Sequence, residues 1–300
     1  MSHSTVPHTD LTGAHLTFWG LLRSEWIKLT TVRSTLWCYA ILAVVIIGLA
    51  VLIGVLQLRN LGTQPGSDQT LSLALGSTTA GIQLAELVAA VLGVLLIASE
   101  YSTGMIRSTF TAAPRRIPVV LAKAVVLGVS TFVVTLVALA IALGVVEAVF
   151  SAHGFAFDAV DWHISMPVLG AAVYVALIAL LAFGAGLLIR ATAGSLATVL
   201  GLLLIVPAIF NVLYAVLNLN GAQTGAGLVT WPHDVSAFLP AQAGAQLYSA
   251  NTAADTRGGT AATIVDSGIQ LNGWGGFGVL AAWVVVVGGV ATALVKRRDV

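Results

Sequence analysis

Charged side chains are scarce in this sequence. The longest charged interruption between apolar runs on the predicted cytoplasmic side is the stretch Glu100–Lys123, EYSTGMIRSTFTAAPRRIPVVLAK. One acid, Glu100, opens the stretch, and four basic residues follow it: Arg107, Arg115, Arg116 and Lys123. Basic residues between apolar runs can simply mark the cytoplasmic side of a membrane protein. That reading explains the charge but not the length, because a helix-compatible run, 101–113, precedes Pro114. The stretch therefore predicts a surface on which a partner protein docks.

Catalytic motifs do not occur in the sequence. A Walker phosphate cradle needs Gly-Lys-Ser/Thr, and none of the three lysines, Lys28, Lys123 and Lys296, follows a glycine. The patterns HExxH and GxSxG are missing too. The single cysteine, Cys38, excludes a disulfide within the chain and a zinc site built from cysteines. We therefore expect no enzyme activity, no metal site and no cofactor in this polypeptide.

Two polar residues lie inside apolar runs. Glu86 falls in the run 80–98, and an acid in lipid is by default a functional candidate, here for binding a cationic substrate group or carrying a proton. A structural role stays open, because 77–79 resembles a helix start and the helix dipole stabilises an acid in the first turns. Asn211 follows Pro207 by four residues, and it could bond a carbonyl that the proline frees or pack between helices.

The composition indicates what must position these residues. Hydrophobic residues make up 58% of the 300 and charged residues 8%, against about 25% charged in soluble domains. A span needs about 20 apolar residues, and six runs qualify: 35–57, 80–98, 118–146, 167–189, 195–217 and 275–295. In the long third run we expect Lys123 to snorkel to the interface. Pro167 should open the fourth span, and Pro207 should kink the fifth. The fold class is thus an all-α membrane protein with six transmembrane helices.

Basic residues decide the topology. With the N-terminus inside, eleven of the thirteen fall on the cytoplasmic side, and only Arg59 and Arg257 fall outside. This bias follows the positive-inside rule. It predicts a multi-pass protein of the plasma membrane with both termini cytoplasmic.

The N-terminal part divides in two. Residues 1–16 are polar and aperiodic, which predicts a disordered cytoplasmic tail. Within 17–33, an apolar stripe recurs at helical spacing, with basic residues off the stripe. The stripe is Phe18, Leu22, Trp26 and Leu29, and the basic residues include Arg23 and Lys28. This pattern favours an amphipathic helix in the membrane interface over an ordinary solvated helix. Residues 34–300 then form the six-helix domain.

The outer segment 218–274 is longer than a connector requires. Its part WPHDVSAFLPAQAGAQLY predicts a short helix that covers the outer face. The following GWGGFG run leads into the last span, so close helix packing or flexibility explains it better than nucleotide binding.

Four stretches in this order resemble the six-span permease subunits of ABC-2 type exporters. They are SEWIKLTTVRST (24–35), the segment 98–123, FGAGLLIRATAGSLATVLGLLLIVP (183–207) with FLPAQAG (238–244) after it, and the ending VKRRDV. The second is the most specific. The residues that match its pattern are Glu100, Gly104, Arg107, Pro114, Arg115, Arg116 and Lys123, and Tyr101 lies among them.

The resemblance implies a permease that moves a hydrophobic or amphiphilic substrate. It implies a dimer, homomeric or heteromeric, in which the coupling segment 100–117 docks on a separate cytoplasmic ATPase that holds ATP and Mg²⁺. It also implies short outer helices between spans five and six. Lipid surrounds such a protein, and no nucleic-acid partner is expected. Two alternatives stay open: a proton-coupled secondary transporter that uses Glu86, and a non-transporting membrane scaffold or immunity protein.

Overall fold

The computed structural model describes residues 17–60, 67–102, 104, 116–155, 157–218, 229–249, 269 and 271–297. All regular secondary structure within these ranges is helical. Six stretches are long and apolar enough to cross a membrane: Arg33–Arg59, Gln69–Tyr101, Ile117–Ser151, Trp162–Ile189, Thr192–Asn218 and Gly273–Leu294. The prediction of an all-α, multi-pass membrane protein with six spans is confirmed. The predicted tail 1–16 lies outside the described residues.

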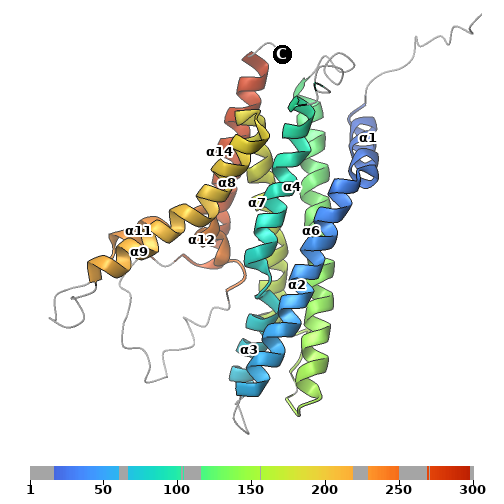
Figure 1. Ribbon diagram of the computed structural model, residues 1–300. Helices are drawn as coiled ribbons and strands as arrows, with labels where there is room; N and C mark the ends of the chain where they lie inside the picture. Colours follow the sequence, from blue (N-terminus) through green and yellow to red (C-terminus); the bar gives the residue numbers. More distant parts are fainter. Residues whose placement is uncertain are drawn as a thin grey trace, which may run out of the picture.

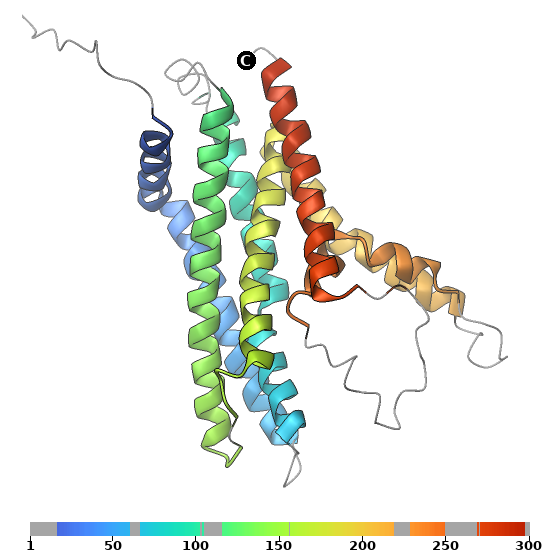
Figure 2. The ribbon, with the colours of Figure 1, turned by 180° about the vertical axis from the view of Figure 1, so that it is seen from behind.

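The helices form an elongated bundle with one oblique arm (Figure 1). In chain order they are α1 (Phe18–Thr31), α2 (Arg33–Asn60), α3 (Ser67–Thr79), α4 (Ile82–Ser102), α6 (Arg116–Ser151), α7 (Trp162–Ile189), α8 (Thr192–Leu200), the π-helical turn η1 (Gly201–Ile205), α9 (Val206–Asn218), α11 (Trp231–Ser236), α12 (Pro240–Ala245) and α14 (Gly273–Arg297). Helix α7 is central and packs against α4, α6 and α14. The arm consists of α8, η1 and α9, which run away from the bundle in both views (Figures 1 and 2).

One end of the bundle gathers the elements that the sequence places inside the cell. Helix α1 begins there, α4 ends there, α6 begins there and α14 ends there (Figure 1). An even number of spans requires the two ends of the chain to meet on one side. We refer to this end as the predicted cytoplasmic end.

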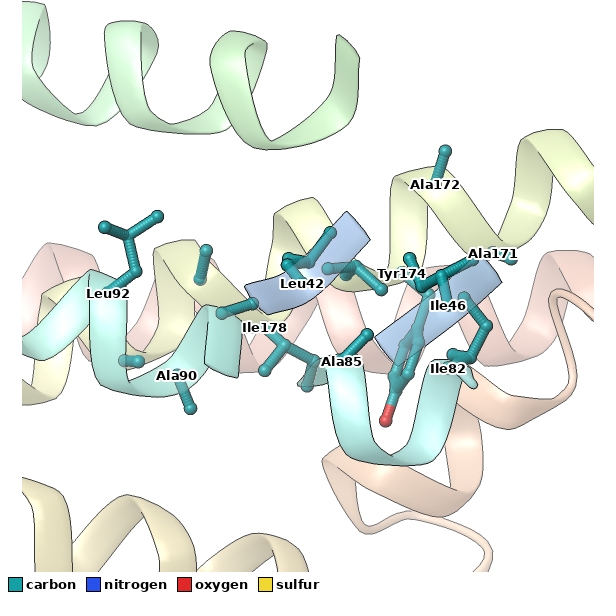
Figure 3. Packing of buried hydrophobic residues seen from close by; sticks show 14 of the residues in the cluster. Leu42, Ile46, Ile82, Ala85, Ala90, Leu92, Ala171, Ala172, Tyr174 and Ile178 are labelled. Carbon is teal, nitrogen blue, oxygen red and sulfur yellow. The ribbon is translucent and has the colours of Figure 1, made fainter. Parts of the chain in front are cut away.

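The tightest packing joins α4 to α7. Small, buried residues recur every four positions along α4 at Ala85, Ala89 and Gly93, and Gly93 lies against Ala179 and Ala182 of α7. Small residues allow helix backbones to approach closely within a membrane. A Cβ built on Gly93 would lie 2.2 Å from the Ala179 carbonyl oxygen, so no larger residue fits. Figure 3 shows part of the buried apolar cluster, with Leu42 and Ile46 of α2 beside Ile82 and Ala85 of α4.

The second span begins earlier than the run 80–98 predicts. Helix α3 extends this span outward to Ser67. The helix is interrupted between Thr79 and Ile82, and α4 continues from there. The hydroxyls of Ser77, Thr78 and Thr79 each donate to the carbonyl four residues earlier, a pattern that bends helices. The reading of 77–79 as a helix start is therefore wrong, because these residues end α3.

Of the two prolines, Pro207 lies inside the fifth span as predicted, whereas the prediction for Pro167 is wrong. Pro167 does not open its span, because α7 begins at Trp162 with Asp161 as N-cap, and the Asp161 carboxylate accepts a bond from the His163 N–H at 2.9 Å. The cost of Pro167 inside the helix is one lost backbone hydrogen bond. In the fifth span the helix distortion is the π-helical turn 201–205, which ends two residues before Pro207. Proline and π-turns commonly occur where helices bend.

The Gly93 contact predicts a pair of glycine variants with opposite behaviour. Gly93→Ala should lower the stability by about 1–3 kcal/mol, because the added methyl group overpacks the α4–α7 contact. Gly144→Ala serves as the matched control. It lies in α6, where an added Cβ would have nothing within 4 Å, so the gain in helix propensity should leave stability unchanged or up to about 1 kcal/mol higher. Thermal unfolding in mild detergent measures both, and equal midpoints would contradict this packing.

Candidate functional site

The predicted docking segment 100–117 is described at its two ends. Glu100 and Tyr101 lie in the last turn of α4, Gly104 follows that helix, and Arg116 begins α6. Three of the predicted residues, Arg107, Pro114 and Arg115, lie outside the described residues. Gly104 has φ +74°, a left-handed conformation that ends a right-handed helix. The helix-compatible run 101–113 is therefore interrupted at Gly104.

Three helices meet in a chain of ion pairs beside these ends. The Lys123 ammonium of α6 lies 2.6 Å from Glu25 Oε2 of α1 and 2.7 Å from Glu100 Oε1 of α4. Glu25 Oε1 in turn lies 2.8 Å from the Lys28 Nζ. We call these four residues the charge cluster. The prediction that Lys123 snorkels to the interface is wrong, since it is only 3% exposed and its charge is neutralised inside the protein.

The charge cluster is electrically balanced, with two carboxylates and two ammonium groups. Burial alone would raise the pKa of Glu25, but the attraction of Lys123, reinforced by Lys28, holds that pKa below its usual value of 4.5. Glu25 is therefore ionised at neutral pH. Buried ion pairs contribute little net stability, but removal of one partner leaves the other charge uncompensated. The cluster thus holds α1, α4 and α6 in one arrangement.

A second contact fixes the same end of α4. The Arg190 guanidinium lies over the Tyr101 ring, 5.2 Å from its centroid, a cation–π distance. Arg190 caps α7 in the left-handed conformation, with φ 61°. Two consecutive residues therefore connect the end of α4 to its neighbours. Glu100 connects it to α6 and, through Lys123, to α1, and Tyr101 connects it to the α7–α8 turn.

Helix α1 places its predicted residues on two sides. Leu22 and Leu29 pack against the bundle, and Phe18 and Trp26 are exposed. Arg23 is exposed and Lys28 half-buried. The interfacial position of the helix stays a prediction. The sequence analysis missed Glu25, although its position three residues after Leu22 and four before Leu29 places it on the packed face.

The two intramembrane polar residues come together. Glu86 and Asn211 line one cavity of about 230 Å³ between α4, α7, α9 and α12. Glu86 is 3% exposed and accepts a hydrogen bond from the Tyr174 hydroxyl of α7. Figure 3 shows the Tyr174 ring pointing from α7 toward α4 beside Ile82 and Ala85. Glu86 therefore lies within the bundle, where it lines the cavity.

Helix α12 closes this cavity because glycines let it approach its neighbours. A Cβ on Gly244 would collide with the Tyr174 ring at 2.2 Å, and one on Gly276 of α14 would lie 2.1 Å from the Ala243 carbonyl oxygen. Gly276 belongs to the GWGGFG run, so close packing is the role of that glycine. The two short helices α11 and α12 lie between the fifth and sixth spans, within the long segment 218–274.

The charge cluster predicts unequal effects for its two lysines. Lys123→Met should cost about 3–5 kcal/mol of stability, because two buried carboxylates lose their shared partner. The matched control Lys28→Met should cost at most about 1 kcal/mol, since the Lys28 side chain is 39% exposed and has one partner. Adding Glu25→Gln and Glu100→Gln to Lys123→Met should recover part of the loss. Thermal unfolding in detergent measures these differences, and an equal cost for both lysines would refute the cluster.

Comparison with known proteins agrees with this architecture. The description of the matching family is "ABC-2 family transporter protein", and the match covers residues 19–300. No curated protein matches the chain. The match includes every described helix from α2 onward and all but the first residue of α1, and with it the charge cluster and the polar cavity. The chain therefore belongs to the ABC-2 family of transporter proteins, as a membrane subunit that is not itself the ATPase.

Proposed function

We propose that this chain is the permease subunit of an ABC-2 exporter in the plasma membrane. It moves a hydrophobic or amphiphilic substrate with energy from ATP, which a separate cytoplasmic subunit binds with Mg²⁺ and hydrolyses. The permease works as a dimer with a second permease subunit, identical or related. The ATPase docks on the segment 100–117.

The observation that carries this proposal is the charge cluster at the two ends of that segment. Glu100 begins the segment and Lys123 follows it, and their carboxylate–ammonium contact of 2.7 Å joins its two flanking helices. Lys123 also holds Glu25 of α1 at 2.6 Å. A force applied to the segment therefore acts on α1, α4 and α6 together.

The mechanism follows from this connection. ATP binding draws the two ATPase subunits together, and the docked segments move with them. Because the ion pairs resist separation in a low-dielectric site, the segment moves three helices instead of bending alone. Transport is then a population shift between two packings of the bundle, biased by the nucleotide state of the partner.

Charge reversal in the segment tests the docking role. Arg115→Glu/Arg116→Glu should lower recovery of the ATPase subunit with the tagged permease about tenfold or more and abolish export, because reversed charges at an interface commonly cost about 2 kcal/mol or more. Affinity purification in mild detergent, followed by mass spectrometry and an ATPase assay, measures this. Insertion and thermal unfolding should stay at wild-type values.

The matched control is Arg59→Glu/Arg257→Glu, which reverses two charges on the predicted outer side. It should leave ATPase recovery unchanged. Normal export by the Arg115/Arg116 reversal would refute docking at these residues. Absence of any ATPase from the wild-type preparation, together with uptake or efflux driven by a proton gradient, would favour the secondary transporter instead.

A further inference from the structure

The cavity around Glu86 has a polar lining that the proposed coupling mechanism does not use. Its polar side chains come from four helices and the turn after α12. They are Gln83 and Glu86 from α4, Tyr174 from α7, Asn211 from α9, Gln242 from α12, and Tyr248 after α12. Apolar residues such as Leu203 and Pro207 complete the wall. Six polar groups thus surround one cavity between helices of the candidate membrane spans.

The cavity contains a carboxylate without a cation. None of the ion pairs among the described residues involves Glu86, whereas the other two buried acids, Glu25 and Glu100, both contact Lys123. The hydrogen bond that Glu86 accepts comes from the neutral Tyr174 hydroxyl. A buried charge in a membrane protein is normally paired or lies in a functional pathway. Alone, a buried acid can stay neutral by holding its proton, and an incoming cationic group would stabilise its ionised form.

The remaining lining suits an organic cation. The rings of Tyr174 and Tyr248 lie 5.4 Å apart between centroids, with a tilt of 44°, and aromatic faces attract ammonium groups. The carboxamides of Gln83, Asn211 and Gln242 supply oxygen acceptors for N–H donors. We propose that this cavity binds the cationic head of an amphiphilic substrate, with the Glu86 carboxylate as counter-ion.

The size of the cavity sets how much of the ligand it holds. Pockets for whole drug-sized ligands usually measure about 300–1,000 Å³, and this one measures about 230 Å³. It therefore receives the ammonium head, while the apolar remainder extends outward past Leu204, which lines the cavity and is exposed. The substrate class of the proposed permease is then amphiphilic ammonium compounds. Binding in the cavity does not depend on the proposed function, whereas transport of the bound compound rests on it.

Binding to the full-length permease in nanodiscs of neutral phosphatidylcholine tests the site. The probes are decyltrimethylammonium, the neutral decyl glucoside and the anionic decyl sulfate, all below micelle formation, with dissociation constants from thermophoresis. The wild type should bind the ammonium probe about tenfold or more tightly than the other two, as expected for a buried charge-assisted contact. Glu86→Gln should remove this preference and leave decyl glucoside binding unchanged. Glu86→Asp, which keeps the charge, should retain the preference.

Equal binding of the three probes by the wild type would overturn the proposal without recourse to any variant. An unchanged ammonium preference in Glu86→Gln would overturn the role of Glu86. These binding measurements need no ATPase, so they separate the two proposals. Charge-selective binding without a co-purifying ATPase would support the cation site and refute the ABC coupling, whereas ATPase recovery with unselective binding would do the reverse.

Discussion

A charge buried at low dielectric needs an opposite charge within contact distance, and this requirement fixes one end of the bundle. The Lys123 ammonium contacts the carboxylates of Glu25 and Glu100 at 2.6 and 2.7 Å. These acids lie 98 and 23 residues before Lys123, in two other helices. Because separation of any pair would leave an uncompensated charge, α1, α4 and α6 keep one mutual arrangement. The segment between α4 and α6 thus starts and ends on a common rigid base.

The sequence predicted the fold class because lipid solvent imposes strong constraints, and it predicted the family through the four stretches that resemble ABC-2 permeases. Long apolar runs and a one-sided distribution of basic residues suffice for six spans and an even topology. The boundaries were less accurate, since helices continue past the apolar runs when the bundle supplies partners. Helix α3 adds a polar turn region before Ile82, where the Ser77 hydroxyl donates to the Gln57 side chain of α2 at 2.9 Å. Such a contact is invisible to a hydropathy pattern.

The site residues were predictable individually but not as groups. Glu100 and Lys123 stood out by charge and Glu86 by its apolar surroundings, yet Glu25 resembled an ordinary helix residue until its partner 98 positions away was known. Glu86 and Tyr174 are likewise 88 positions apart. A single sequence shows the periodicity along each helix. It does not show which faces of two helices pack together, because that depends on contacts between residues far apart in the sequence, such as the Gly93 contact.

Helix α4 connects the two polar sites. Glu86 and Glu100 are fourteen positions apart, which corresponds to about 21 Å along an α-helix, and Gly93 between them packs backbone to backbone on α7. In the proposed mechanism, a motion that enters at Glu100 carries α4 and α7 as one unit, with α12 attached through the Gly244–Tyr174 contact. The opposite wall of the cavity belongs to η1 and α9, in the arm that leaves the bundle (Figures 1 and 2). In the proposed mechanism, the cavity changes shape where α9 meets this unit. The π-helical turn at 201–205 lies at that junction, where a short distorted helix yields more easily than a regular one.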